Sequence, residues 1–180
     1  MTPTHDLRDR TRACHDAVDT AFGAHDLGDR GAYAQLLTVH ARAVAAAEAA
    51  LGHWPELPAW RARMPMLAAD LDGLDVALPA PLPFSLANAA QAWGALYVLE
   101  GSRLGNAMLA RSVGPGLPHA YMAARHEQGG WRALLAAIDA RAEAGGAQWL
   151  DDAVAGAEAA FALFLDARRT RLDETEPAIT

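Results

Sequence analysis

Apolar residues recur along most of this chain at intervals of three and four, the spacing that places side chains on one face of an α-helix. The first such stretch spans residues 3–22 and follows Thr2, which predicts an N-cap with proline at the first helical position. The second spans residues 29–51 and begins at Asp29, another predicted cap. No segment shows the strict alternation of a half-buried strand. The pattern therefore predicts an all-α protein.

The remainder of the chain predicts further helices separated by glycine and proline. We expect these helices at residues 65–72, 85–113, 118–128, 131–143 and 147–170. Residues 74–84 contain three prolines and predict a stiff extended connector. Residues 172–180 form a polar tail that we expect to fray. Together these elements predict one domain over residues 1–180, built from roughly seven or eight helices.

The predicted helix 85–113, with Ser85 as its N-cap, has an unusual set of interior glycines. Gly94, Gly101 and Gly105 are spaced by seven and four residues, so they share one face. Each costs about 1 kcal/mol relative to alanine, which this chain uses freely. A glycine face permits either close packing against another helix or a flat ligand lying against the backbone. The spacing alone leaves both interpretations open.

Composition and charge narrow the class of protein. The net charge of −7 argues against a general nucleic-acid binder. Cys14 is the single cysteine, so an internal disulfide is impossible. The first ten residues are polar and charged, unlike a signal peptide, and no uncharged apolar run has transmembrane length. We therefore expect a cytoplasmic protein that has no membrane or nucleic-acid partner.

Two of the seven histidines fall on predicted buried stripes. His40 is expected to be a core histidine with one hydrogen bond, although a ligand role stays open. His15 lies on the predicted buried face of the first helix, and Asp19 follows one turn later. A carboxylate at that position can hold the second ring nitrogen of a ligating imidazole. The other five are predicted to lie at the surface, near helix ends or turns: His5, His25, His53, His119 and His126.

The spacing of candidate ligands excludes several familiar sites. A di-iron bundle needs inward Glu-x-x-His pairs, and none occurs. One cysteine is too few for a typical zinc cluster, and Cys14-His15 lacks the earlier cysteine of a c-type haem motif. A nucleophile elbow and a phosphate-binding glycine loop are also missing. An inward histidine facing a glycine-lined helix remains coherent, because haem iron accepts one histidine and needs an uncrowded opposite side.

Two segments resemble the haem oxygenase family. LRDRTRACHDAVD (7–19) resembles the first helix of that family, and GALYVLEGSRLGNAML (94–109) resembles its distal helix, especially in the bacterial, phytochrome-associated type. Within the second segment, Tyr-Val-Leu-Glu-Gly-Ser-x-Leu-Gly is the most specific part. The resemblance extends over nearly the whole chain. It implies a single-domain helical fold in which haem b is sandwiched between the first helix and a glycine-kinked distal helix.

The resemblance also implies roles on the two faces of the haem. His15 becomes the proximal iron ligand, and Asp19 its hydrogen-bonding partner. Gly101 and Gly105 become the distal glycines whose backbone lies over the haem. Ser102 occupies a position where many family members carry an acidic residue that orders distal water.

Further residues match positions around the edge of the haem. Arg8 and Arg132 would pair with propionates, Tyr97 would line the pocket edge, and Phe161 would form a proximal wall. A solvated surface role for the two arginines, and a packing role for the two aromatic residues, stay open. Asn106 replaces a residue that is small in many relatives. Its amide could reorganise distal water or alter which meso carbon is cut.

The implied activity is the oxidative cleavage of haem, which is both substrate and cofactor, to biliverdin, carbon monoxide and iron. It uses O2 and an external electron donor, because no flavin or nicotinamide site is visible in the sequence. A ferredoxin-like protein or a flavin reductase would supply electrons, and a bacteriophytochrome could receive the biliverdin. Two alternatives remain: a non-catalytic haem carrier or sensor on the same scaffold, and a helical interaction module whose glycines serve packing alone.

Overall fold

The structure is a computed structural model that describes residues 2–23 and 25–175. Every regular element in those residues is helical, as the hydrophobic pattern predicts. The elements are α1 (Pro3–Phe22), α2 (Arg30–Leu51), α3 (Met64–Asp72), α4 (Ala89–Leu109), the 3₁₀ turn η1 (Ala110–Ser112), α5 (Ala120–Ala123) and α6 (Gly130–Thr175). Among these described helices, none is both long and apolar enough to cross a lipid bilayer.

The boundaries of α1, α2 and α3 agree with the predicted ones to within a residue. The Thr2 side chain accepts a hydrogen bond from the amide of His5, and the Asp29 side chain accepts one from the amide of Ala32. Each cap satisfies a backbone amide that has no partner inside the helix. These helix starts could be predicted because capping depends on residues that are adjacent in sequence.

The predicted start of α4 at Ser85 is wrong, since the helix begins four residues later. Asn88 is the N-cap, and its side chain accepts a hydrogen bond from the amide of Gln91 at 2.9 Å. The Gln91 side chain in turn accepts one from the amide of Ala87, also at 2.9 Å. This reciprocal pairing stabilises a start at Ala89. The proline connector consequently runs on to residue 88.

The C-terminal helices depart from prediction in two places. The helix expected at 118–128 is reduced to the single turn of α5, and residues 124–129 form a loop. The break expected at the Gly145-Gly146 pair is confirmed as a kink inside α6, where Gly146 has φ 71° and ψ −165°. Helix α6 continues through residues 172–175 of the predicted tail, and residues 176–180 lie outside the described residues.

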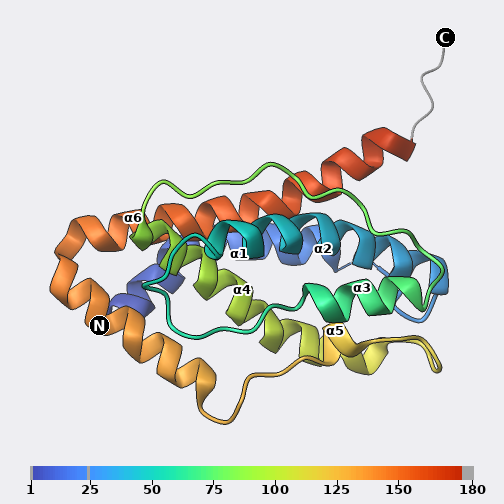
Figure 1. Cartoon of the computed structure of the whole chain (residues 1–180), viewed down its shortest axis with the longest axis horizontal. Coiled ribbons are helices and arrows are strands. Elements are labelled where there is room, and N and C mark those ends of the chain that lie inside the picture. The colour runs from blue at the N-terminus through green and yellow to red at the C-terminus, as the bar shows by residue number, and fades with distance from the viewer. Residues whose placement is uncertain (1, 24, 176–180) are drawn as a thin grey trace.

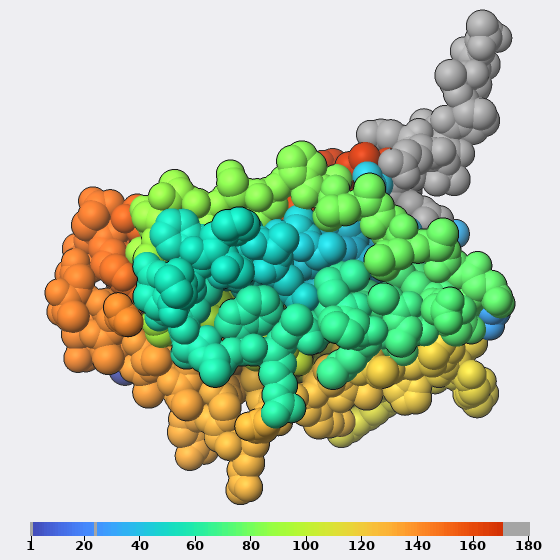
Figure 2. Space-filling view, in the orientation of Figure 1, coloured from blue at the N-terminus to red at the C-terminus, as the bar shows by residue number. Residues whose placement is uncertain are grey.

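Helix α6 is the element against which the others assemble. Helices α4, α1 and α2 all pack on it, and α3 joins them through contacts with α2 and α5. Figure 1 shows α6 turning sharply at its kink and then running along the length of the molecule. The connector that leads to α4 follows the same edge, and Figure 2 shows it as a green band along the top of that face. This arrangement places α1 and α4 on a common support.

Candidate functional site

The first of the three aligned glycines in α4 serves helix packing. A methyl group on Gly94 would lie 1.8 Å from the carbonyl oxygen of Ala153 in α6. On the other helix, a methyl group on Gly156 would lie 2.0 Å from the carbonyl oxygen of Gln91. The backbones of α4 and α6 therefore touch where they cross, which requires glycine on both sides. At this one position the packing interpretation is correct.

The other two glycines do not meet the backbone of α6. A methyl group on Gly101 would meet the ring of Trp131 at 3.4 Å, and one on Gly105 would meet nothing within 4 Å. The same half of α4 exposes three large apolar side chains, Leu104, Met108 and Leu109. This part of α4 therefore presents bare backbone bordered by exposed apolar groups, a surface suited to a flat apolar ligand.

The prediction that His15 lies on a buried face is wrong in this structure, because its side chain is 60% exposed. Helix α1 is covered by α6 along the neighbouring stripe that contains Leu7 and Thr11, and His15 lies on the flank of that stripe. The imidazole still contacts α6, with its ring edge-on to Phe161 at a centroid distance of 5.9 Å. The predicted pair of His15 and Phe161 is thus brought together.

The Nδ1 atom of His15 lies 3.3 Å from a carboxylate oxygen of Asp19, the partner that the spacing predicts. A carboxylate of Asp16 lies farther away, at 3.9 Å. Among the described residues, Nε2 has no hydrogen-bond partner. One nitrogen of the imidazole therefore lies beside a carboxylate, while the other is available to a ligand or a metal ion.

A second group of predicted residues gathers where α4 meets the start of α6. The ring of Tyr97 packs against Trp131 at a centroid distance of 5.5 Å. Burial raises the pKa of Tyr97, and the positive charge of Arg8 on α1 acts in the opposite direction. Arg8 is thus close enough to α4 to influence it. Arg132 is exposed and lines a groove of about 410 Å³ between α4 and the loop before α6.

Ser102 is half-buried and Asn106 is buried. The Ser102 hydroxyl donates a hydrogen bond to the carbonyl of Leu99 at 2.7 Å. Asn106 is buried beside Tyr121 and helps to lower the pKa of that phenol, although burial raises it more. The Asn106 amide nitrogen has no partner in good hydrogen-bond geometry.

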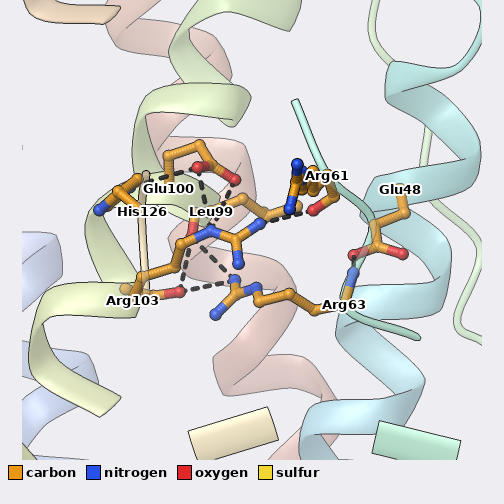
Figure 3. A network of polar contacts seen from close by, with 8 residues as sticks. Glu48, Arg61, Arg63, Leu99, Glu100, Arg103 and His126 are labelled. Carbon is orange, nitrogen blue, oxygen red and sulfur yellow. Dashed lines mark hydrogen bonds and ion pairs between the residues drawn. The ribbon is translucent and has the colours of Figure 1, made fainter. Parts of the chain in front are cut away.

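A network of charged residues, which the sequence did not predict, connects α4 to the segment before α3 and to His126 (Figure 3). Arg103 is 4% exposed and donates to both carboxylate oxygens of Glu100. His126, predicted to lie at the surface, has a side chain that is only 11% exposed, and its Nε2 lies 3.2 Å from Glu100. The geometry of that contact is not a hydrogen bond, and burial lowers the pKa of His126. The Glu-x-x-Arg spacing within an apolar helix was the available signal.

The network continues to the segment before α3. Arg63 is 1% exposed and donates through Nη2 to the Leu99 carbonyl and to the Ser102 hydroxyl, both at 2.8 Å. The backbone amide of Arg63 donates to Glu48 at 2.6 Å. Arg103 donates to the carbonyl of Arg61. No local pattern marks Arg63 as buried, because its partners lie 36 and 39 residues away in sequence.

The predicted core role of His40 is confirmed. Its Nδ1 lies 2.9 Å from the Tyr121 hydroxyl, and its ring meets Phe22 and Phe164 edge-on. Burial lowers the pKa of His40 to about 3, so the imidazole is neutral at physiological pH. A further buried carboxylate, Asp70, accepts the backbone amides that begin α5.

Comparison with known proteins gives two informative matches. The chain is 37% identical over 147 residues to a heme oxygenase of Xanthomonas campestris pv. campestris (strain 8004), which covers 76% of this chain and 88% of that protein. Its fold matches a crystal structure of the NO- and CO-bound heme oxygenase from Neisseria meningitidis with a TM-score of 0.78 and 23% identity, covering all of this chain and 96% of the other. No protein-family model matches the chain.

Proposed function

This chain belongs to the haem oxygenase family, and we propose how its own residues serve that family's reaction. The protein is a haem-degrading enzyme with an all-helical fold, and haem is both its substrate and its cofactor. The reaction cleaves haem with O2 to biliverdin, carbon monoxide and iron. Two observations support a site: the Nε2 atom of His15 has no partner among the described residues, and the backbone at Gly105 is open, on helices that both pack on α6.

The residues present fit a haem. A porphyrin is flat and largely apolar, and the exposed Leu104, Met108 and Leu109 beside open backbone form a matching surface. Helices α1 and α4 both pack on α6, so the imidazole and the glycines belong to elements that share one support. When bound, the haem supplies the iron that activates O2 and the ring that is oxidised.

His15 is the proposed proximal ligand, through Nε2. Asp19, next to Nδ1, favours the tautomer with the proton on Nδ1 and leaves the Nε2 lone pair free. Phe161 holds the ring edge-on and limits its rotation.

Gly101 and Gly105 are the proposed distal residues. Since neither carries a side chain, the backbone can come close to the substrate and still leave room for O2. Trp131, next to Gly101, closes one side of that space. Ser102 is proposed to act through its hydrogen bonds with the Leu99 carbonyl and with Arg63, and Asn106 through its buried position beside Tyr121.

Arg8 and Arg132 are proposed to bind the two propionates. A guanidinium pairs with a carboxylate through parallel hydrogen bonds, and both side chains are exposed and free to turn. The Tyr97 ring packs against Trp131, the chain neighbour of Arg132, and the charge of Arg8 acts to lower the pKa of Tyr97. These contacts support the proposal that Tyr97 lines the edge of the pocket.

Electrons must come from outside the chain, because the sequence has no flavin or nicotinamide motif. We propose a ferredoxin-like protein or a flavin reductase as donor, and a bacteriophytochrome as a recipient of the biliverdin. Spectrophotometric turnover with each class of donor distinguishes them.

Haem titration and aerobic turnover test the proposed site. The wild type should give a Soret band that disappears, with growth of biliverdin absorption, when a reductant and O2 are supplied. His15→Ala should lose the histidine-type ferrous spectrum and reduce turnover by roughly 100-fold or more. His5→Ala is the matched control, because His5 is also exposed on α1 and pairs with an aspartate one turn later.

Three outcomes would contradict the proposal. An unchanged ferrous spectrum in His15→Ala would show that another residue binds the iron. A return of the wild type to ferric haem without biliverdin would support the carrier alternative. The absence of any Soret shift on titration would support an interaction module.

A further inference from the structure

Arg63 is a buried cation whose guanidinium binds α4 at the turn that carries Gly101. Its Nη2 donates to the Leu99 carbonyl and to the Ser102 hydroxyl, and Ser102 donates to the same carbonyl (Figure 3). The guanidinium also lies over the Tyr121 ring, 5.2 Å from its centroid. All three of these partners are uncharged.

Joining two segments through a buried charge with uncharged partners is unfavourable in free energy. Removing a cation from water costs several kcal/mol, and apolar replacements of buried ions are often neutral or stabilising. The Nη1 atom of Arg63 is buried and has no hydrogen-bond partner among the described residues. Glu48, the nearby acid, accepts hydrogen bonds from the backbone amides of Arg63 and Met64 and so holds the chain in place. Stability alone therefore gives a poor account of this arginine.

The hydrogen bonds from Arg63 and Ser102 share one acceptor, the Leu99 carbonyl of α4. In an unbroken α-helix the Leu99 carbonyl accepts only the amide of residue 103. Two further donors, from Arg63 and Ser102, share this carbonyl, and side chains that bond to a helix carbonyl in this way often bend the helix locally. The affected turn contains Gly101, which has no side chain to resist bending.

A second contact, from α4 to the segment before α3, fixes the distance between these two parts of the chain. Arg103, on α4, donates to the carbonyl of Arg61, two residues before Arg63. Glu100 holds the Arg103 guanidinium through both carboxylate oxygens. Each segment thus sends one arginine to the other, so neither can slide along its neighbour without breaking one of these contacts.

We propose that Arg63 is a positioning residue for haem cleavage, because it fixes the path of α4 at Gly101 and so the height of the distal backbone over the substrate ring. This inference rests on the proposed distal role of Gly101. The height of that backbone determines which meso carbon is open to attack. Arg63 therefore influences the isomer of biliverdin that forms, although it does not touch the haem.

Arg63→Met, with a side chain of similar length and no charge, is the main test. Hydrogen–deuterium exchange on the haem-free protein should show amides 101–106 exchanging about fivefold faster, the effect of losing roughly one hydrogen bond. With haem, kcat should fall about tenfold at a KM within about twofold, and the biliverdin isomer ratio should change. Arg63→Lys should restore part of both effects, since an ammonium can reach one of the two acceptors.

Arg61→Met is the matched control, because the Arg61 side chain is 78% exposed and pairs with Glu127 at the surface. It should leave exchange, turnover and isomer ratio unchanged. Ser102→Ala removes one donor to Leu99 and should give an intermediate effect, which keeps the test decisive if Arg63→Met fails to fold.

The outcomes separate this inference from the proposed function. Unchanged exchange at 101–106 in both Arg63→Met and Ser102→Ala would overturn it. Faster exchange with an unchanged isomer ratio would also overturn it and leave Arg63 a structural role alone. A wild type that makes no biliverdin would refute the proposed function instead, a result visible before any variant is compared.

Discussion

Two glycines on the same face of α4 should respond oppositely to the addition of one methyl group. At Gly94 the methyl would lie 1.8 Å from the Ala153 carbonyl oxygen and 2.8 Å from the Ala157 amide nitrogen. Both are backbone atoms of a helix and cannot move aside independently. At Gly105 nothing lies within 4 Å, so Gly105→Ala meets no obstacle in the haem-free protein.

The magnitudes follow from these environments. Gly105→Ala should gain the helix propensity of alanine, about 0.5–1 kcal/mol, and raise Tm by about 1–4 °C in a domain of this size. Gly94→Ala gains the same propensity but forces α4 and α6 apart at their crossing. Overpacking costs about 1–3 kcal/mol and can cost more where backbone must shift. We expect a net loss of roughly 2 kcal/mol or more.

The assay is urea unfolding of the haem-free variants followed by circular dichroism, together with haem turnover. Gly105→Ala should be more stable than the wild type and yet turn over haem more slowly, because the methyl occupies proposed substrate space. This combination separates a site glycine from a packing glycine. If Gly105→Ala were destabilised without haem, the space above it would not be open. If it were stabilised with full turnover, the glycine would have no distal role.

Two further predictions concern conformation and pH. Gly146→Ala should cost about 1–3 kcal/mol in denaturant titration, because φ 71° and ψ −165° suit glycine alone and no contact changes; a neutral result would mean that the kink is not required. His40 has a pKa near 3 when folded and near 6.5 when unfolded, so between these values only the unfolded chain takes up the proton. Its contribution is therefore complete above about pH 6.5 and falls by about 1.4 kcal/mol per pH unit toward pH 3. His40→Gln should flatten this slope in urea titrations at several pH values, and an unchanged slope would refute the buried, neutral imidazole.

Local patterns were sufficient for much of this protein. The all-helical class, the caps at Thr2 and Asp29, and the break at Gly146 follow from residues within one or two turns of each other. The alignment of Gly101 and Gly105 with Gly94 also follows, because helical periodicity sets the direction of each position around the axis. Where two local signals competed, as with Ser85 and Asn88, the residue with a reciprocal partner became the cap.

The tertiary structure decided which groups lie next to each of these helix positions. Periodicity aligns Gly94 and Gly105, but only the crossing with α6 makes one a packing contact and leaves the other open. Periodicity likewise could not show that α6 covers the stripe of α1 beside His15 and leaves the imidazole exposed. The burial of Arg63 could not be predicted from periodicity, because the atoms that Arg63 binds are distant in sequence. Spacing along a chain sets where a side chain points, whereas its neighbours depend on how the helices pack.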